Sequence, residues 1–290
     1  MLYIVATPIG NLGDMTQRAV EVLCRADIIA AEDTRQSMKL LSHFNISPSK
    51  LVSYHKFNET ASAEGLVSAM KEGRDVAVIT DAGTPCISDP GTHLVERASE
   101  EGIQITAVPG ACAAIAALSV SGFHAVSFAF YGFLPRGSSE ISNMYQSLRK
   151  SEISVSVFYE SPLRIIKSVE ILEKELPEAR VCLCNDLTKK FERYYRGSPE
   201  EVLAQLRENP RAAYGEYVLV LEYTQRLKEN ASDKQFSPEA WILERMLSDK
   251  CSIREAADAL IQEGISGYSK NQLKRAGIGL KNMLKQNVAE

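Results

Sequence analysis

DVAVITDAGTPCISDPG, residues 75–91, joins a short apolar run rich in β-branched residues to a turn rich in Gly, Pro and Asp. The apolar half has the length and composition of a buried strand, and the polar half cannot continue it. A helical pattern, GTHLVERASEEG, follows directly. The order of strand, turn and helix indicates one unit of a parallel sheet, in which ligands bind beyond the carboxyl ends of the strands.

The same order recurs on both sides of this stretch. Four further apolar runs alternate with helical patterns: LYIVAT (2–7), DIIAAE (27–32), LVSYH (51–55) and QITAVP (104–109). Strands that alternate with helices predict a mainly parallel sheet with both faces covered. Polar segments follow these runs, namely PIGNLGD, EDTR, HKFNE and PGACAA. Because the carboxyl ends of parallel strands meet at one edge, we expect a binding site there.

The second half of the chain predicts a mixed sheet. Its strand-like runs are 127–135, 154–161, 180–188, 192–197 and 216–223, and helical patterns lie at about 138–150, 162–176 and 199–207. The sequence therefore predicts an α/β fold with three regions. A parallel α/β domain covers 1–122, a mixed α/β domain covers 123–224, and a linker with a small helical appendage covers 225–290.

The last region is predicted to hold three helices and a basic surface. They begin at Ser237-Pro238, at Ser252-x-x-Glu255 and at Ser269-x-x-Gln272, and Gly264 and Gly267 interrupt the last two. Residues 225–290 carry 11 basic and 9 acidic side chains, whereas residues 1–224 carry 22 and 28. The segment 264–289 contains no acid and five cations: Lys270, Lys274, Arg275, Lys281 and Lys285. A basic patch of this kind fits nucleic acid, and a solvated helix face explains it equally well.

Composition excludes several classes of protein. The 290 residues are 45% hydrophobic and 24% charged, which is typical of a globular protein and not of a disordered tail. The six cysteines are scattered without a C-x-x-C pair, so we expect a reduced, cytoplasmic protein without a metal site. Cys182 and Cys184 fall in one apolar strand, where core packing is the expected role. The N-terminus lacks the basic start of a signal peptide, and the uncharged segment 102–135 is broken by Pro and Gly, so no membrane span is expected.

Several common motifs are absent. The chain has no G-x-G-x-x-G, no P-loop, no G-x-S-x-G and no H-E-x-x-H. It has instead ATPIGNLGDMT, AAEDTR, DAGTPCISDPG, VPGACAAIAALSVSGF, FYESPLR and AAYGEYVLVLE, in this order. This series resembles the tetrapyrrole methylase superfamily, and within it the branch that methylates ribosomal RNA. The resemblance covers the whole chain, and DAGTPCISDPG and FYESPLR are its most specific segments.

The resemblance implies two α/β domains with S-adenosylmethionine in the cleft between them, and a homodimer. It also implies 2′-O-methylation of the ribose of a decoding-region cytidine in 16S rRNA, within the small ribosomal subunit. By position in the matching motifs, it gives these cofactor-binding residues: Ile9, Asp81, Thr84, Ala111, Cys112, Tyr159 and Gly215. Thr80-Asp81-Ala82 stands where other members have Gly-Asp-Pro, which counts against a porphyrin or corrin substrate.

A ribose hydroxyl is a poor nucleophile, so a nearby base would help the reaction. The candidates at the expected sheet edge are Glu32, Asp33, His55 and Glu160. Of these, Asp33, His55 and Glu160 are predicted as catalytic, with Asp33 preferred. Each has a structural alternative, because Asp33 can cap the helix that follows it, His55 can be a strand-end residue without a catalytic role, and Glu160 can pair with Arg164.

Contacts to RNA are expected from arginines beside the motifs and from the basic appendage. The expected residues are Arg35, Arg136, Arg164, Lys270, Lys274 and Arg275. The aromatic rings of Tyr54, Phe57, Tyr131 and Phe133 can stack on a splayed base or pack in the protein, and packing is favoured for Phe133. Two other functions compete: methylation of a small tetrapyrrole-type molecule, and a helix-turn-helix protein whose body senses a ligand.

Overall fold

The computed structural model describes residues 1–223, 237–263 and 268–286 of the chain. Two compact units make up the fold, Met1–Thr224 and Gln225–Glu290, and each is described by itself. The first unit contains two separate sheets of five strands each. This confirms the α/β class, while the division of residues 1–224 into domains at 122/123 stays a prediction.

The first sheet is fully parallel and has the order β3-β2-β4-β1-β5. Its strands are β1 (Leu2–Val5), β2 (Ile28–Ala31), β3 (Leu51–Ser53), β4 (Val76–Ile79) and β5 (Ile105–Val108). Every residue of β2 and β4 is buried, as expected for the central strands of a sheet covered on both faces. The five strands lie within the five predicted runs and confirm them.

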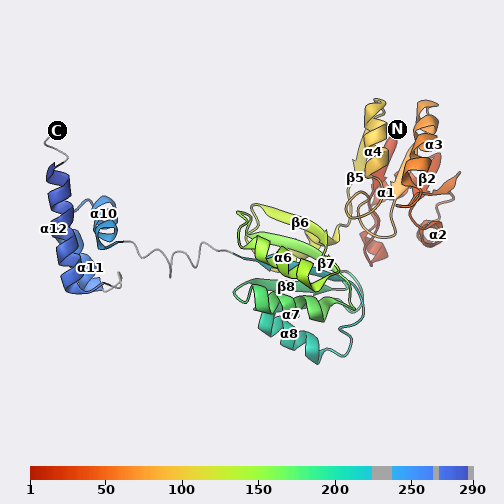
Figure 1. The fold of residues 1–290 in the computed structure, drawn as a ribbon. Coiled ribbons are helices and arrows are strands. Elements are labelled where there is room, and N and C mark those ends of the chain that lie inside the picture. The colour runs from red at the N-terminus through yellow and green to blue at the C-terminus, as the bar shows by residue number, and fades with distance from the viewer. Residues whose placement is uncertain (224–236, 264–267, 287–290) are drawn as a thin grey trace. The chain divides into compact units, whose positions relative to one another are not determined.

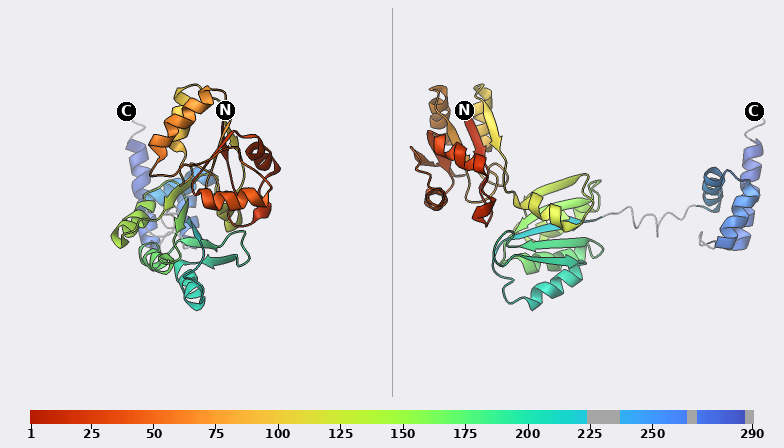
Figure 2. Two further views of the ribbon diagram at one scale, coloured as in Figure 1. Left: turned by 90° about the vertical axis from the view of Figure 1, so that its right-hand side faces the viewer. Right: turned by 180° about the vertical axis from the view of Figure 1, so that it is seen from behind.

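Helices cover both faces of this sheet (Figures 1 and 2). They are α1 (Gln17–Arg25), α2 (Thr34–His43), α3 (Glu59–Lys71) and α4 (Thr92–Glu100), preceded by the 3₁₀ helix η1 (Leu12–Asp14). Leu23 of α1 and Leu41 of α2 belong to one core cluster, and Met70 of α3 and Leu94 of α4 belong to another. The two clusters use alternate residues of the same strands, so the sheet separates two cores.

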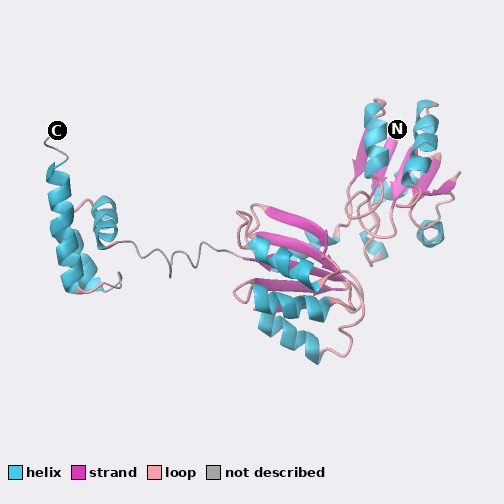
Figure 3. Ribbon diagram, in the orientation of Figure 1, coloured by secondary structure: helices cyan, strands magenta, loops and turns pink. Residues whose placement is uncertain are grey.

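The second sheet is mixed and has the order β6-β7-β10-β8-β9. Its strands are β6 (Phe128–Phe133), β7 (Val155–Glu160), β8 (Arg180–Asn185), β9 (Arg193–Gly197) and β10 (Tyr217–Glu222). Only β6 and β7 are parallel to each other, and the remaining pairs are antiparallel. Three helices cover one face of this sheet (Figure 3): α6 (Ser138–Leu148), α7 (Ile165–Glu175) and α8 (Pro199–Glu208).

The other face of the second sheet packs against α5 (Ala113–Ser121), which follows the last strand of the first sheet. Ala114 and Ala117 of α5 lie in one core cluster with Val157, Cys182 and Cys184, among others. The two thiol sulfurs lie 4.0 Å apart and are fully buried, which confirms core packing. The uncharged segment 102–135 therefore forms a strand, a buried helix and a second strand, and none of the described helices has the length and apolarity needed to cross a bilayer.

The second unit contains α10 (Pro238–Asp249), α11 (Ile253–Glu263) and α12 (Lys270–Gln286). Two capping boxes begin the last two helices, because Ser252 and Glu255 exchange hydrogen bonds, as do Ser269 and Gln272. Ile242, Leu260 and Leu273 are among the side chains of a small shared core. The three predicted helix starts are confirmed, while Gly264 and Gly267 lie outside the described residues.

Candidate functional site

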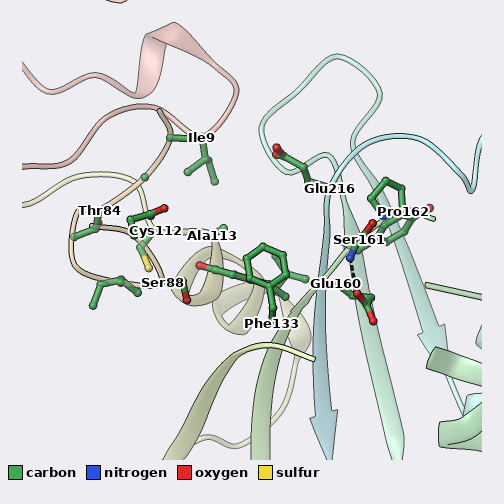
Figure 4. Close-up of a pocket in the computed structure, with 17 residues that line it drawn as sticks. Ile9, Thr84, Ser88, Cys112, Ala113, Phe133, Glu160, Ser161, Pro162 and Glu216 are labelled. Atoms are coloured by element: carbon green, nitrogen blue, oxygen red, sulfur yellow. Dashed lines mark hydrogen bonds between the residues drawn. The ribbon is translucent and has the colours of Figure 1, made fainter. Parts of the chain in front are cut away.

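A cavity of about 370 Å³ opens inside the first unit, between the carboxyl edge of the first sheet and the second sheet (Figure 4). From the first half of the chain it is lined by Ile9, by residues of the 82–89 turn, and by Cys112 and Ala113 at the start of α5. Phe133, residues 159–162 and residues 216–218 line it from the second half. The polar segments after β1, β4 and β5 thus meet at one place.

The turns after β1, β4 and β5 are tied together by hydrogen bonds. Thr7 and Gly83 exchange two backbone hydrogen bonds, of 2.8 and 3.1 Å. The Thr84 hydroxyl donates to the carbonyl oxygen of Ala111 at 3.0 Å. Gly83 has a φ of +84° and a Cβ there would lie 3.4 Å from the Ile9 side chain, so glycine suits this crossing point. The three turns form one rigid wall of the cavity.

The DAGTPCISDPG turn carries two residues in an unfavourable backbone conformation. Cys86 and Ser88 have φ values of +71° and +68°, in the left-handed region that favours glycine. Gly91 has a φ of +136°, and a Cβ at this position would lie 2.6 Å from the Cys86 sulfur. Left-handed residues other than glycine persist where the surrounding structure imposes them, and they cluster at functional sites.

Tyr159 of β7 and Phe133 of β6 form the aromatic wall on the opposite side. Their ring centroids lie 5.5 Å apart in an edge-to-face arrangement. The Tyr159 hydroxyl accepts a hydrogen bond from the backbone N–H of Ala114 at 3.3 Å, which joins the second sheet to the first turn of α5. Burial, above all, raises the pKa of Tyr159 to about 12, so the phenol stays neutral.

Glu160 also lines the cavity, but its carboxylate is occupied by protein donors. Arg164 lies 2.5 Å from one carboxylate oxygen, which also accepts from the Ser161 N–H at 2.6 Å (Figure 4). The Ser168 hydroxyl donates to the other oxygen at 2.5 Å. The side chain of Glu160 is 0% exposed. The structural alternative, pairing with Arg164, is therefore present, and it leaves Glu160 poorly placed to accept a proton from a substrate.

The cofactor-binding predictions divide into two groups. Ile9, Thr84, Cys112 and Tyr159 line the cavity. Ala111, Asp81 and Gly215 do not, although each is next to a residue that does. Their roles in binding a cofactor stay predictions.

Asp81 and Gly215 have other surroundings. Asp81 lines a neighbouring cavity of about 420 Å³, which shares Ile9, Ala82 and Glu216 with the first. Gly215 has a φ of +86°, and a Cβ there would lie 2.5 Å from an Asp186 carboxylate oxygen. Gly215 therefore suits the tight turn before β10, and the next residue, Glu216, lines the cavity.

The other two candidate bases lie outside the cavity lining. Asp33 caps α2 by accepting a hydrogen bond from the Arg35 N–H at 2.8 Å. This is the structural role that the sequence offered as the alternative to catalysis. The Arg35 guanidinium also pairs with Asp33 at 3.0 Å, and these contacts lower the pKa of the Asp33 carboxyl. His55 lies shortly after the end of β3. Its Nδ1 atom is buried without a hydrogen-bond partner among the described residues.

The predicted RNA-binding arginines differ in how many partners their guanidinium groups have within the protein. Arg164 donates to the carbonyl oxygens of Pro135 at 2.8 Å and Leu134 at 3.3 Å, besides its pairing with Glu160. Arg136 is exposed and has no partner in the described part of the chain. Arg164 therefore holds the β6–α6 loop, while Arg136 presents an available cation.

The cations predicted in the second unit are all exposed: Lys270, Lys274 and Arg275 of α12. Lys274 and Lys281 line a cavity of about 630 Å³ together with Arg254 of α11. Lys285 also lies on α12, but its side chain is outside the described residues.

The aromatic residues predicted to stack on a base also differ in their exposure and contacts. Tyr54 is 1% exposed and packs in the core, whereas Phe57 is 96% exposed. Tyr131 stacks on Phe158 with centroids 5.0 Å apart. Phe133 packs against Tyr159 in the cavity wall, and the residue is 60% exposed.

Sequence reasoning missed Asp89 as a member of the cavity lining. Burial, together with the nearby carboxylates Glu32 and Asp81, raises the pKa of Asp89 to about 7. The available signal was the position of Asp89 within the same turn as Asp81 and Thr84. No group of side chains suited to a metal ion occurs among the described residues.

Known proteins resemble this chain over most of its length. The family model of the tetrapyrrole (corrin/porphyrin) methylases matches residues 1–203. The ribosomal RNA small subunit methyltransferase I of Haemophilus influenzae is 40% identical over 96% of this chain and 96% of its own length. The protein of that name from Escherichia coli O157:H7 is 41% identical over 94% of this chain and 92% of its own.

A solved structure supports the fold. The uroporphyrin-III C-methyltransferase of Thermus thermophilus, complexed with S-adenosylhomocysteine, superposes with a TM-score of 0.52 at 17% identity. The match covers 78% of this chain and 99% of that one. With its family model and its relatives in agreement, the chain belongs to the tetrapyrrole methylase family, in the branch of the small-subunit ribosomal RNA methyltransferases.

Proposed function

We propose that this protein transfers a methyl group from S-adenosylmethionine to the ribose 2′-hydroxyl of a decoding-region cytidine in 16S rRNA. The observation that carries the proposal is the match over nearly the whole chain to relatives named ribosomal RNA small subunit methyltransferase I. Those relatives also match the helical second unit, which supports a large substrate. The site residues, the nucleotide and the 2′-oxygen belong to this proposal.

The cavity fits the methyl donor. Thr84, Cys112 and Ala113 line it, and their backbone N–H groups donate to no acceptor in the described part of the chain. They suit the carboxylate and hydroxyl oxygens of S-adenosylmethionine, while Ile9 and the Tyr159 ring suit its adenine. When bound, this molecule supplies a methyl group on a sulfonium that leaves as a neutral thioether.

The chain contributes mainly position and exclusion of water. Two walls held by hydrogen bonds, one at Thr84 and one at Tyr159, fix the width of the cavity. Alignment of a nucleophile with a methyl carbon can lower a barrier by about 7–11 kcal/mol in favourable cases. Because the leaving group is neutral, no acid is needed on its side.

We assign the contacts to the substrate to exposed cations of the first and second units. Arg136 and the exposed residues Lys270, Lys274 and Arg275 are the proposed contacts to phosphates. The protein as a whole has a net charge of −4, so we expect a modest dependence of RNA affinity on salt. We propose further that it works in the cytoplasm, as a homodimer, on the assembled small ribosomal subunit.

The test is methyl transfer to small ribosomal subunits that lack the modification. The purified protein is incubated with radiolabelled S-adenosylmethionine, and ribose methylation is mapped by resistance to alkaline cleavage. Label at a single decoding-region cytidine is the expected result. If the subunits stay unlabelled although the cofactor binds tightly, the protein is still a methylase, but RNA is not its substrate. Failure to bind the cofactor would remove both, and transfer to a small tetrapyrrole would establish the competing function.

A further inference from the structure

We propose that Asp89 is the general base of this reaction, and that its carboxylate accepts the proton of the ribose hydroxyl as that oxygen is methylated. The inference rests on the proposed function and names the group that carries its proton transfer. None of the three bases predicted from the sequence offers a free carboxylate or imidazole in the cavity.

The first argument is the state of the carboxylates that line the cavity. They are Asp89, Glu160 and Glu216. Glu160 is held by Arg164, Ser161 and Ser168, and Glu216 is paired with Lys189 at 2.8 Å. Asp89 accepts no hydrogen bond and joins no ion pair within the described residues. Of the three, only the Asp89 carboxylate has both its oxygens available to a substrate.

The second argument is the way in which the chain holds Asp89 in place. The turn that carries it contains Cys86 and Ser88 in left-handed conformations, and the Cys86 N–H donates to the Pro90 carbonyl oxygen at 3.3 Å. The Cys86 sulfur fills the space where a side chain of residue 91 would lie. Such conformations are unfavourable for residues other than glycine, and they are kept where a precise position matters. The strain therefore fixes residue 89 relative to Thr84 in the same wall.

The third argument is the charge around this carboxylate. The titratable groups that face it are Glu32 after β2, Asp81 after β4, Cys86 on its own turn and Tyr159 on β7. Burial comes first, and the two carboxylates second, in raising the pKa of Asp89 to about 7. A general base works best when its pKa lies near the working pH, because it is then both ionised and basic. Asp89 meets this condition.

The step balances with no further reactant. The ribose oxygen forms a bond to the methyl carbon while its proton passes to the Asp89 carboxylate. The bond between the methyl carbon and sulfur breaks, and its electron pair stays on sulfur. The products are the methylated ribose, a neutral thioether and a protonated Asp89, which returns its proton to water.

The experiment compares Asp89→Asn and Asp89→Glu with the wild-type protein on unmodified small subunits. We expect Asp89→Asn to lower kcat by about 10²–10⁴-fold, and Asp89→Glu to recover part of it. The wild-type kcat should fall on the acid side of about pH 7, and this decrease should be absent in Asp89→Asn. Binding of S-adenosylhomocysteine, measured by calorimetry, should change less than about threefold, because the proposed role of Asp89 is towards the ribose.

Two further variants make the result decisive. Asp14→Asn makes the same chemical change at an exposed aspartate outside the cavity lining and should keep wild-type activity. His55→Gln removes the imidazole that the sequence offered as an alternative base, and the acid-side decrease should survive in it. If Asp89→Asn keeps more than about a tenth of the wild-type kcat, or if the decrease vanishes in His55→Gln, Asp89 is not the base. A wild-type protein that methylates no ribosomal RNA would instead overturn the proposed function, and this inference with it.

Discussion

Glu160, the last residue of β7, forms an ion pair with Arg164, the N-cap residue of α7, and the arginine joins that pair to the loop that follows β6. One guanidinium nitrogen lies 2.5 Å from the carboxylate, and the same group donates to the carbonyl oxygens of Leu134 and Pro135. The Glu160 side chain is fully buried, whereas that of Arg164 is 28% exposed. A residue expected to contact RNA thus stabilises the cavity wall.

Replacing Arg164 should therefore destabilise the protein. Arg164→Ala leaves the Glu160 carboxylate buried without its cation, and we expect the free energy of unfolding to fall by about 3 kcal/mol. Urea denaturation followed by circular dichroism measures this change. Arg136→Ala is the matched control, because that arginine is exposed and without a partner in the described part of the chain. If Arg164→Ala leaves the free energy of unfolding unchanged and lowers only the affinity for RNA, Arg164 contacts RNA instead.

The Thr84 hydroxyl should matter for cofactor binding because it ties the turn after β4 to the turn after β5. Thr84→Val keeps the shape of the side chain but removes the hydrogen bond to the Ala111 carbonyl oxygen. A hydrogen bond of this kind contributes about 1 kcal/mol, so affinity for S-adenosylhomocysteine should fall about fivefold. Calorimetric titration is the measurement, and Thr60→Val on the exposed surface of α3 is the control. Equal affinity in the two variants would contradict the role of this bond.

Removing the charge of Asp89 should make the protein more stable above neutral pH. The folded state holds the proton of Asp89 up to about pH 7, whereas the unfolded chain loses it near 3.8. This group therefore lowers the stability of the fold as pH rises from about 4 to about 7, and the full cost is present above pH 7. After allowance for partial exposure, Asp89→Asn should gain about 1–2 kcal/mol at pH 8 and almost nothing at pH 4. Denaturation midpoints at both pH values measure it, and an equal gain at both would contradict a raised pKa of Asp89 in the folded state.

The cations of α12 should set the salt dependence of RNA binding. In Lys270→Ala/Lys274→Ala/Arg275→Ala, affinity for the small subunit should fall at least tenfold, and the slope against the logarithm of salt should decrease by about 2. The control is Lys150→Ala/Lys167→Ala/Lys174→Ala, which removes three exposed lysines from the first unit. Filter binding at several salt concentrations gives both slopes. Equal slopes in the two triple variants would remove the second unit from the RNA contacts.

Much of this architecture could be predicted from the sequence because it depends on local patterns. Runs such as DVAVIT and LYIVAT are apolar over the length of one strand, and they became β4 and β1. Ser252 with Glu255 and Ser269 with Gln272 satisfy backbone groups within a single turn, so the helix starts could be read directly. The meeting of the turns at one edge follows from the parallel order.

The roles of single carboxylates could not be predicted in this way. Glu160 was expected at the site and lies there, but its availability depends on Ser168 and Arg164, which α7 brings back to it. Asp89 was overlooked because its surroundings depend on burial and on Glu32, which follows another strand, β2, as well as on Asp81 in its own turn. Sequence spacing shows which strand a residue follows, whereas the donors and charges that face it depend on packing between elements.

The buried thiols of Cys182 and Cys184 can report when the second sheet opens locally. Both thiols are fully buried in β8, whereas Cys24 on α1 is exposed. An alkylating reagent can modify Cys24 in the folded protein, but it reaches the β8 pair only when that sheet separates from α5. The rate of modification at β8 therefore measures the free energy of a local opening event, with Cys24 as the internal reference for reagent reactivity. The same chain can thus be assayed for local opening of its second sheet with no label added by mutation.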